Sequence, residues 1–295
     1  MADRKPIPLD DGTTPRKPFW PRSWIVRAGL LIAFGSLFID IIITHRSSPA
    51  PSARVALPAT TRPKTRPAVE TVRVRRADHG GSAYTIVEVD LTQAALRLFW
   101  KKPGGERFAR FAAVKAHLER NGERLLFATN AGIFDTNFAP CGLHVEDGRQ
   151  RVPLNLRSGS GNFFLKPNGV FLIDAGGARI IDAAKYDGTR GGVRVAVQSG
   201  PLLVLDGGIH PAFKAGSDSL RKRSGVGVVS AQRIAFALSD EPVNFHVFAA
   251  LFLEDLHCRN ALYLDGVISQ FYVPSDEPKP HDGDYAGILA VIDRK

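Results

Sequence analysis

The chain has 295 residues, of which 44% are hydrophobic and 23% are charged, an ordinary composition for a globular protein. Its formal net charge of +10 is concentrated near the N-terminus, where the first 79 residues hold 14 basic and 6 acidic side chains. The remainder holds 25 basic and 23 acidic side chains. This near balance gives the region expected to fold no charge reason to bind nucleic acid, which we therefore exclude as a partner.

An apolar segment at residues 25–43 follows a basic N-terminal tail and contains only Arg27 and Asp40 as charged residues. Nineteen residues are enough to span a bilayer, and basic residues before such a segment stay on the cytoplasmic side. We therefore predict a single-pass transmembrane signal anchor in the bacterial inner (cytoplasmic) membrane, with the folded region periplasmic or extracellular. A cleaved signal peptide is the alternative, and it would export the same region.

The composition then predicts the boundaries of the remaining parts. Residues 1–24 are expected to form a disordered cytoplasmic tail, residues 44–79 a linker rich in Pro and Arg, and residues 80–295 one domain. Strands at residues 83–90 and 95–100 are expected to pair with each other. A helix is predicted over residues 107–120.

Strand and turn signals dominate the rest of the domain. Hairpins are predicted for residues 142–145 with 151–154, and for residues 162–165 with 170–173. Further strands are predicted at residues 125–129, 193–197, 202–205, 225–229, 234–238, 261–264 and 288–292, and a second helix over residues 243–256. Many strands and few helices indicate a single α+β domain on a mixed, largely antiparallel sheet.

Several familiar catalytic signatures are absent. Ser199 lies in a segment that resembles a nucleophile elbow, but Val197 and Pro201 occupy the positions where that motif requires glycine, so a serine hydrolase is disfavoured. Cys141 and Cys258 could form a disulfide in an exported domain, yet we favour two buried thiols.

Metal-ligand spacing is also lacking. No Cys/His pattern typical of zinc occurs, and the turn between His281 and Asp284 is more simply a solvated turn than a site for a hard cation. We predict no required metal and no organic cofactor.

Polar residues gather instead in five short segments at predicted strand ends beside glycines, where backbone and side chains can meet a ligand. These segments are residues 128–135, 198–201, 221–227, 239–244 and 263–269. Each alone is more often a turn than a site, because Asn, Asp and Gly tolerate left-handed backbone conformations.

Together these segments resemble the phosphodiester glycosidase family, which includes the animal N-acetylglucosamine-1-phosphodiester alpha-N-acetylglucosaminidases ("uncovering enzymes") and exported bacterial proteins. Asn-Ala-Gly-Ile-Phe at residues 130–134 matches the family's Asn-x-Gly-x-Phe turn. Residues 223–228 are similar to its Arg-x-x-x-Gly strand, and residues 264–269 to its Leu-Asp-Gly-x-x-Ser turn. The sequence departs from the family at Val267 and Ile268, where many members carry further glycines.

The resemblance implies hydrolysis of a sugar-1-phosphodiester, in envelope or exported glycans such as exopolysaccharide, at the bond between the anomeric carbon and the phosphate oxygen. Asp265 is the first choice for the carboxylate that faces the developing oxocarbenium ion or activates water, with Asp240 or Glu146 as a second member. Arg223 is the candidate for bidentate phosphate recognition, although a strand-end salt bridge would also explain it.

The other expected substrate-binding residues are Asn130, through its amide, and Ser269, through its hydroxyl, with Gly132 and Gly266 shaping the two turns. A purely structural role in those turns is an equal alternative for Asn130 and Ser269. Two other functions stay open for the whole domain. One is a noncatalytic glycan-binding or exopolysaccharide-assembly protein, and the other is a metal-dependent phosphodiesterase that cuts the opposite P–O bond.

Overall fold

The computed structural model describes residues 70–188, 192–274 and 283–294. The predicted tail, the predicted anchor at residues 25–43 and most of the predicted linker lie outside the described residues. Within the described ranges, no helix has both the length and the apolar character needed to cross a membrane.

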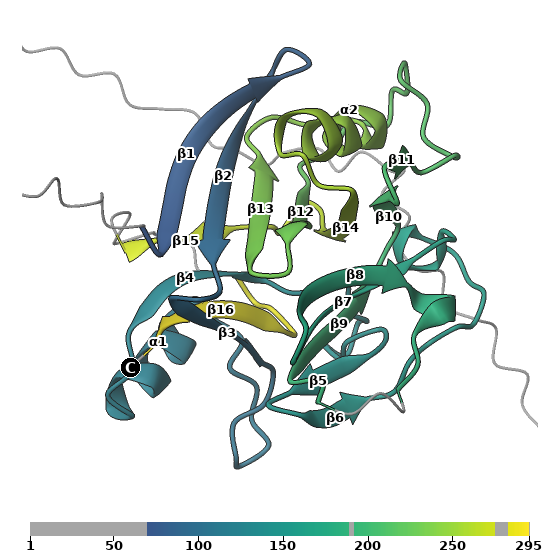
Figure 1. Cartoon of the computed structure of the whole chain (residues 1–295). Helices are drawn as coiled ribbons and strands as arrows, with labels where there is room; N and C mark the ends of the chain where they lie inside the picture. The colour runs from purple at the N-terminus through teal and green to yellow at the C-terminus, as the bar shows by residue number, and fades with distance from the viewer. Residues whose placement is uncertain (1–69, 189–191, 275–282, 295) are drawn as a thin grey trace, which may run out of the picture. The chain divides into compact units, whose positions relative to one another are not determined.

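The described strands form three sheets, and every pair of neighbouring strands among them is antiparallel (Figure 1). The seven-stranded sheet has the order β1-β2-β13-β12-β14-β10-β11. Its strands are β1 (Val72–His79), β2 (Ser82–Asp90), β13 (Arg233–Ser239), β12 (Ser224–Ser230), β14 (Asn260–Asp265), β10 (Leu202–Leu205) and β11 (Gly208–Ile209).

The two smaller sheets come from the remaining strands. The four-stranded sheet consists of β15 (Phe271–Tyr272), β4 (Leu125–Asn130), β16 (Ile288–Asp293) and β3 (Ala94–Phe99), in that order. The five-stranded sheet consists of β6 (Arg149–Val152), β5 (His144–Glu146), β9 (Val195–Ser199), β7 (Gly169–Asp174) and β8 (Gly177–Asp182). The prediction of a largely antiparallel fold with few helices is confirmed, whereas the prediction of one mixed sheet is wrong.

Strand β1 lies inside the segment that was assigned to the linker, so the folded region begins before residue 80. The sequence pattern did not indicate a strand here, because Arg73, Arg75 and Arg76 give the segment the charge of a linker. Charged side chains are common on edge strands, where they oppose pairing with other chains, and β1 is the edge of its sheet.

Two predicted strand pairings are also wrong. Strand β2 pairs with β1 and β13, while β3 pairs with β16 in another sheet, so the segments at 83–90 and 95–100 are not partners. Residues Asn162–Phe164 form a short 3-10 helix (η1) in place of a strand, and β7 pairs with β8, which the sequence pattern missed. The glycine at 161 adopts φ 86°, which ends the extended chain before η1.

Helix α1 (Phe111–Arg120) begins four residues later than predicted, after Ala109 adopts a positive φ of 61°. Helix α2 (Phe245–Ala250) begins at a cap in which the Asn244 side chain accepts a hydrogen bond from Val247 N at 2.9 Å. It continues into a π-helical turn, η3 (Leu251–Asp255), and a further 3-10 turn, η2, spans Ala183–Lys185.

The helices cover the outer faces of two stacked sheets. Helix α2 packs on the seven-stranded sheet, and α1 packs on the four-stranded sheet (Figure 1). Between these sheets Phe127 of β4 is fully buried, with its ring centroid 5.1 Å from Phe236 of β13 and 5.0 Å from Phe271 of β15. The five-stranded sheet adds residues such as Phe171 and Val197 to the same apolar core. The three sheets therefore share one core, which brings the ends of strands from different sheets together.

Candidate functional site

Three strands, one from each sheet, end at the same place. Asn130 is the last residue of β4, Ser199 of β9 and Asp265 of β14. Asn130 Nδ2 lies 3.4 Å from Asp265 Oδ2, and Ser199 Oγ donates to the carbonyl oxygen of Leu264 at 3.0 Å. The sequence prediction that Asn130 and Asp265 meet is consistent with this contact.

Gly132 lies in the turn that follows β4. A Cβ atom on Gly132 would lie 2.8 Å from the carbonyl oxygen of Gln198 and 3.0 Å from Ser199 Cβ. Any larger residue would push β4 and β9 apart. Gly132 therefore allows the close approach of β4 and β9 that builds the site. This is a structural role and does not require Gly132 to contact a ligand.

Asp265 is partly buried as a residue, and its carboxylate is poorly solvated. Desolvation by burial raises its pKa to about 6, while hydrogen bonds from Gly266 N and Asn130 act in the opposite direction. Gly266 N donates to Oδ1 at 2.7 Å. Titratable groups whose pKa is shifted in this way by loss of solvation are common in active sites.

The orientation of the Asn130 amide is set by a second contact. Its Oδ1 accepts a hydrogen bond from Gln270 N at 3.2 Å, so its NH2 group faces Asp265. Asn130 is 1% exposed. It therefore acts on Asp265 as a fixed donor that favours the ionised carboxylate.

Ser269 holds the turn after β14 in place. Its backbone N donates to Gly266 O at 2.9 Å, and its hydroxyl is 2.8 Å from that of Ser224 on β12. Both serines are fully buried. These contacts support the structural alternative for Ser269, because its hydroxyl is directed to a neighbouring strand.

Arg223 is buried beside this cluster and is 1% exposed. Its Nε donates to Val243 O at 2.7 Å and its Nη2 donates to Ser219 O at 2.9 Å. The guanidinium also lies over the ring of Phe245, 3.6 Å from its centroid. No carboxylate of the described residues forms an ion pair with Arg223. The strand-end salt bridge that was the alternative explanation for Arg223 is therefore not what holds it.

Tyr263 connects Arg223 with Asp265, and the sequence analysis did not select it. Burial and the charge of Asp265 raise the pKa of the Tyr263 hydroxyl well above its usual range, while the charge of Arg223 and hydrogen bonds with Arg223 and Asn162 oppose that rise. Tyr263 lies two residues before Asp265 on β14, where the pairing with β12 shifts register. The sequence does not indicate this position, because tyrosine in a strand is an ordinary core residue and the register shift appears only in the folded sheet.

Cys141 is a second neighbour that was not selected as a site residue. Burial and the charges of Asp135 and Asp265 raise the pKa of its thiol to about 11, so the thiol stays neutral at physiological pH. Both cysteines are free, with Cys258 buried and Cys141 partly exposed. Both cysteines are thiols, as predicted, but only Cys258 is buried as expected.

The two other predicted carboxylates have partners elsewhere. Asp240 forms an ion pair with Arg76 and accepts a hydrogen bond from Thr85 Oγ1 at 3.3 Å. Glu146 lies 3.1 Å from His144 Nε2 and 3.3 Å from Arg151 Nε. Among the described residues, no hydrogen bond or ion pair joins Asp240 or Glu146 to Asp265.

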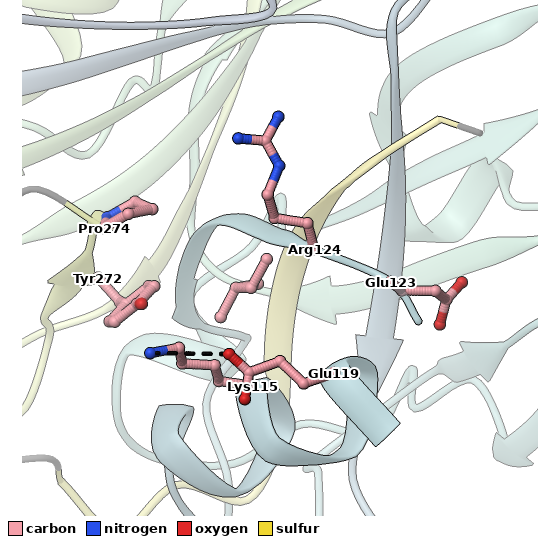
Figure 2. A pocket seen from close by; sticks show the side chains of 7 residues that line it. Lys115, Glu119, Glu123, Arg124, Tyr272 and Pro274 are labelled. Atoms are coloured by element: carbon pink, nitrogen blue, oxygen red, sulfur yellow. Dashed lines mark ion pairs between the residues drawn. The ribbon is translucent and has the colours of Figure 1, made fainter. Parts of the chain in front are cut away.

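A surface depression lies away from this cluster, at the opposite end of β4. It has a volume of about 340 Å³ and is lined by Lys115, Glu119, Glu123, Arg124, Leu125, Tyr272 and Pro274 (Figure 2). Its acidic and basic side chains have ion-pair partners within the chain: Lys115 with Glu119, Glu123 with Arg97, and Arg124 with Asp293. Since its charges are already compensated, the chemistry favours the Asp265 cluster as the functional site despite the size of the depression.

Metal-binding side chains do not converge in the part of the chain that the structure describes, where no group of three or more His, Cys, Asp or Glu residues could hold a metal ion. The turn between His281 and Asp284 lies partly outside the described residues.

Comparisons with known proteins agree with the placement of the motifs. A profile of the phosphodiester glycosidase family matches residues 123–286. This chain belongs to the phosphodiester glycosidase family. The matched range includes Asn130, Arg223 and Asp265.

Individual relatives extend this result. The uncharacterized protein YigE of Escherichia coli strain K12 is 39% identical over 180 residues, which cover 60% of this chain and 69% of YigE. The fold is similar to the catalytic domain of zebrafish N-acetylglucosamine-1-phosphodiester alpha-N-acetylglucosaminidase auto-inhibited by its pro-peptide, with TM-score 0.51, 19% identity, and coverage of 76% of this chain and 82% of that chain. A hypothetical protein from Synechocystis matches with TM-score 0.48, 14% identity, and coverage of 76% and 62%.

Asp265→Asn is expected to stabilise the fold above pH 6. Because the folded-state pKa is raised from 3.8 to about 6, the folded state binds the proton more tightly, and the ionised carboxylate lowers stability as pH rises through this interval. Removing the charge should increase the free energy of unfolding by about 1–3 kcal/mol at pH 7.5. Urea denaturation at pH 3.5, 5, 6 and 7.5 measures it, with the surface variant Asp240→Asn as a control. A gain that does not grow with pH would contradict the assigned cause.

Arg223→Lys is expected to destabilise the fold by about 2–3 kcal/mol although it keeps the charge. A single ammonium cannot donate to both Val243 O and Ser219 O while stacking on Phe245. Chemical denaturation of this variant should be compared with that of Arg233→Lys, which changes an exposed arginine on β13. Equal stability of the two variants would show that the two-pronged contact is unimportant.

Proposed function

We propose that this domain hydrolyses sugar-1-phosphodiesters, breaking the bond between the anomeric carbon and the phosphate oxygen. The observation that carries the proposal is the poorly solvated carboxylate of the partly buried residue Asp265 beside the Asn130 amide, in a member of the phosphodiester glycosidase family. The zebrafish enzyme acts on N-acetylglucosamine phosphodiesters according to its name, so N-acetylglucosamine is a first sugar to test here.

The chemistry needs a negative charge next to the anomeric carbon, because positive charge develops there as the bond breaks. With a pKa of about 6, Asp265 is largely ionised at neutral pH and can provide that charge. Water adds to the anomeric carbon, the electron pair of the broken C–O bond leaves with the phosphate, and the proton from water passes to Asp265. Phosphate is a good leaving group, so this reaction does not require a strong general acid.

A basic segment next to this strand end supports a phosphodiester as the substrate. Arg221, Lys222 and Arg223 are consecutive and lead directly into β12, whose first residue pairs with Asp265. The carbonyl oxygen of Lys222 lies 3.6 Å from the position that a Cβ on Gly266 would occupy. Arg223 is buried and has no anionic partner among the described residues. A buried cation of this kind gains stability from a nearby anion.

Arg223 thus has a different role from the one inferred from the sequence. Two of its donors already bind backbone carbonyls, so direct bidentate contact with a phosphate is not the arrangement seen. We assign it a supporting role: it holds residues 219–223 against the strand end and adds positive potential. Arg221 and Lys222, the two residues before Arg223, are our candidates for contact with the phosphate.

The location of the reaction is part of the proposal. We place the domain in the periplasm or outside the cell, attached to the inner membrane through residues 25–43, on the basis of the apolar segment and the basic tail before it. A reporter that fluoresces or acts only in the cytoplasm, fused after residue 295, should be inactive.

Isotope labelling tests which bond is broken. Methyl esters of α-glucose-, α-galactose-, α-mannose- and α-N-acetylglucosamine-1-phosphate should be incubated with the protein in oxygen-18 water. We expect the label in the released sugar, because water attacks the anomeric carbon. Label in the phosphate would indicate the phosphodiesterase alternative, which a chelator should then inhibit. Hydrolysis of none of the four esters would favour a noncatalytic role.

Substitution of Asp265 tests the site. Asp265→Asn should lower kcat by about 10³-fold or more, since it keeps the shape of the side chain but removes its charge. In the unmodified protein kcat/KM should fall as pH decreases through about 6, because protonation removes the same charge. Asp240→Asn and Glu146→Gln are the matched controls and should retain most activity. Loss of activity in either control to the level of Asp265→Asn would contradict this assignment.

A further inference from the structure

Two apolar side chains lie at the tip of the turn that follows Asp265. The hydrogen bond from Ser269 N to Gly266 O closes a four-residue turn in which Val267 and Ile268 are the central residues. Their exposed fractions are 73% and 41%. Central turn positions usually carry Gly, Asn, Asp, Ser or Pro, whereas β-branched residues favour strands. This turn therefore exposes hydrocarbon at a place where local preference would put polar groups.

The turn is fixed at both ends. Gly266 N donates to the Asp265 carboxylate at 2.7 Å, and the Ser269 hydroxyl is bound to that of Ser224. Ser224 in turn pairs with Asp265 across β12 and β14. Val267 and Ile268 are therefore held at a defined place beside the catalytic carboxylate, and a ligand that contacts them loses little entropy to ordering the turn.

The segment before β12 adds to the same surface. The Lys222 backbone lies against Gly266, and Leu220, two residues earlier, is 47% exposed. Arg221 and Lys222 follow Leu220 directly. The turn exposes hydrocarbon, and the segment beside it is basic in sequence. A phosphodiester with an apolar chain on its phosphate would match both features.

We propose that the site acts on phosphodiesters whose leaving group carries a hydrocarbon chain, and that Val267 and Ile268 contact this chain. The inference rests on the proposed function. The sugar lies at Asp265 and Asn130, the phosphate lies beside the basic residues, and the chain esterified to the phosphate extends along the turn. Hydrolysis then releases the free sugar and an alkyl phosphate, and the phosphate takes the electron pair of the broken bond.

Chain length provides the test. Methyl and octyl esters of whichever sugar-1-phosphate is hydrolysed in the labelling experiment should be compared below the micelle concentration of the octyl ester. The unmodified protein should show a kcat/KM at least about tenfold higher for the octyl ester, because each buried methylene group favours binding. In the double variant Val267→Ser with Ile268→Ser, the ratio of the two values should fall to about one.

A matched control separates this contact from general surface hydrophobicity. Val229 is 41% exposed near the other end of β12, so Val229→Ser should keep the preference for the octyl ester. Equal kcat/KM values for both esters in the unmodified protein, or a preference that survives the double substitution, would overturn the inference while hydrolysis itself stands. If neither ester is hydrolysed, the proposed function fails and this inference fails with it.

Discussion

The arrangement of this domain depends on keeping one carboxylate poorly solvated and yet accessible. Asp265 ends a strand, and at an open sheet edge such a residue would be fully hydrated. Here the ends of β4 and β9 lie against it, and loss of hydration raises its pKa to about 6. Hydrogen bonds from Gly266 and Asn130 recover part of the lost stabilisation, so the ionised form persists at neutral pH. The shared core of three sheets is what brings these strand ends together.

The charges around this carboxylate are compensated by dipoles and aromatic rings. Among the described residues, Arg223 contacts backbone carbonyls and aromatic side chains. Asp265 accepts hydrogen bonds from a backbone N–H and from an amide side chain. Tyr263 lies between the two groups and responds to both charges. A direct ion pair would satisfy each charge internally and leave less attraction for a ligand. Under the proposed function, this separation leaves the carboxylate to face the sugar and the basic segment to face the phosphate.

The sequence predicted most of the strands, though not β1 or β8, and the meeting of Asn130 with Asp265, because these follow from local patterns, namely alternation and a polar residue beside glycine at a strand end. It could not predict which strands pair, since β2 and β3 are adjacent in the chain but belong to different sheets. Asp240 and Glu146 were chosen because they are carboxylates in glycine-rich regions, but their neighbours Arg76 and His144 are fixed by tertiary packing. Tyr263 escaped selection because its sequence signal is that of a core residue.

Adjacent residues of the turn after β14 have two different roles. Its first and last residues are tied down, Gly266 by the carboxylate and Ser269 by Ser224, and these contacts set the position of Asp265. The two central side chains project outward and are exposed. Under the proposed function, a substitution at Val267 or Ile268 would change the surface that the leaving group meets without changing the hydrogen bonds that position the carboxylate. Under the same proposal, these two exposed residues would set the preference for the phosphate substituent while the chemistry stays unchanged.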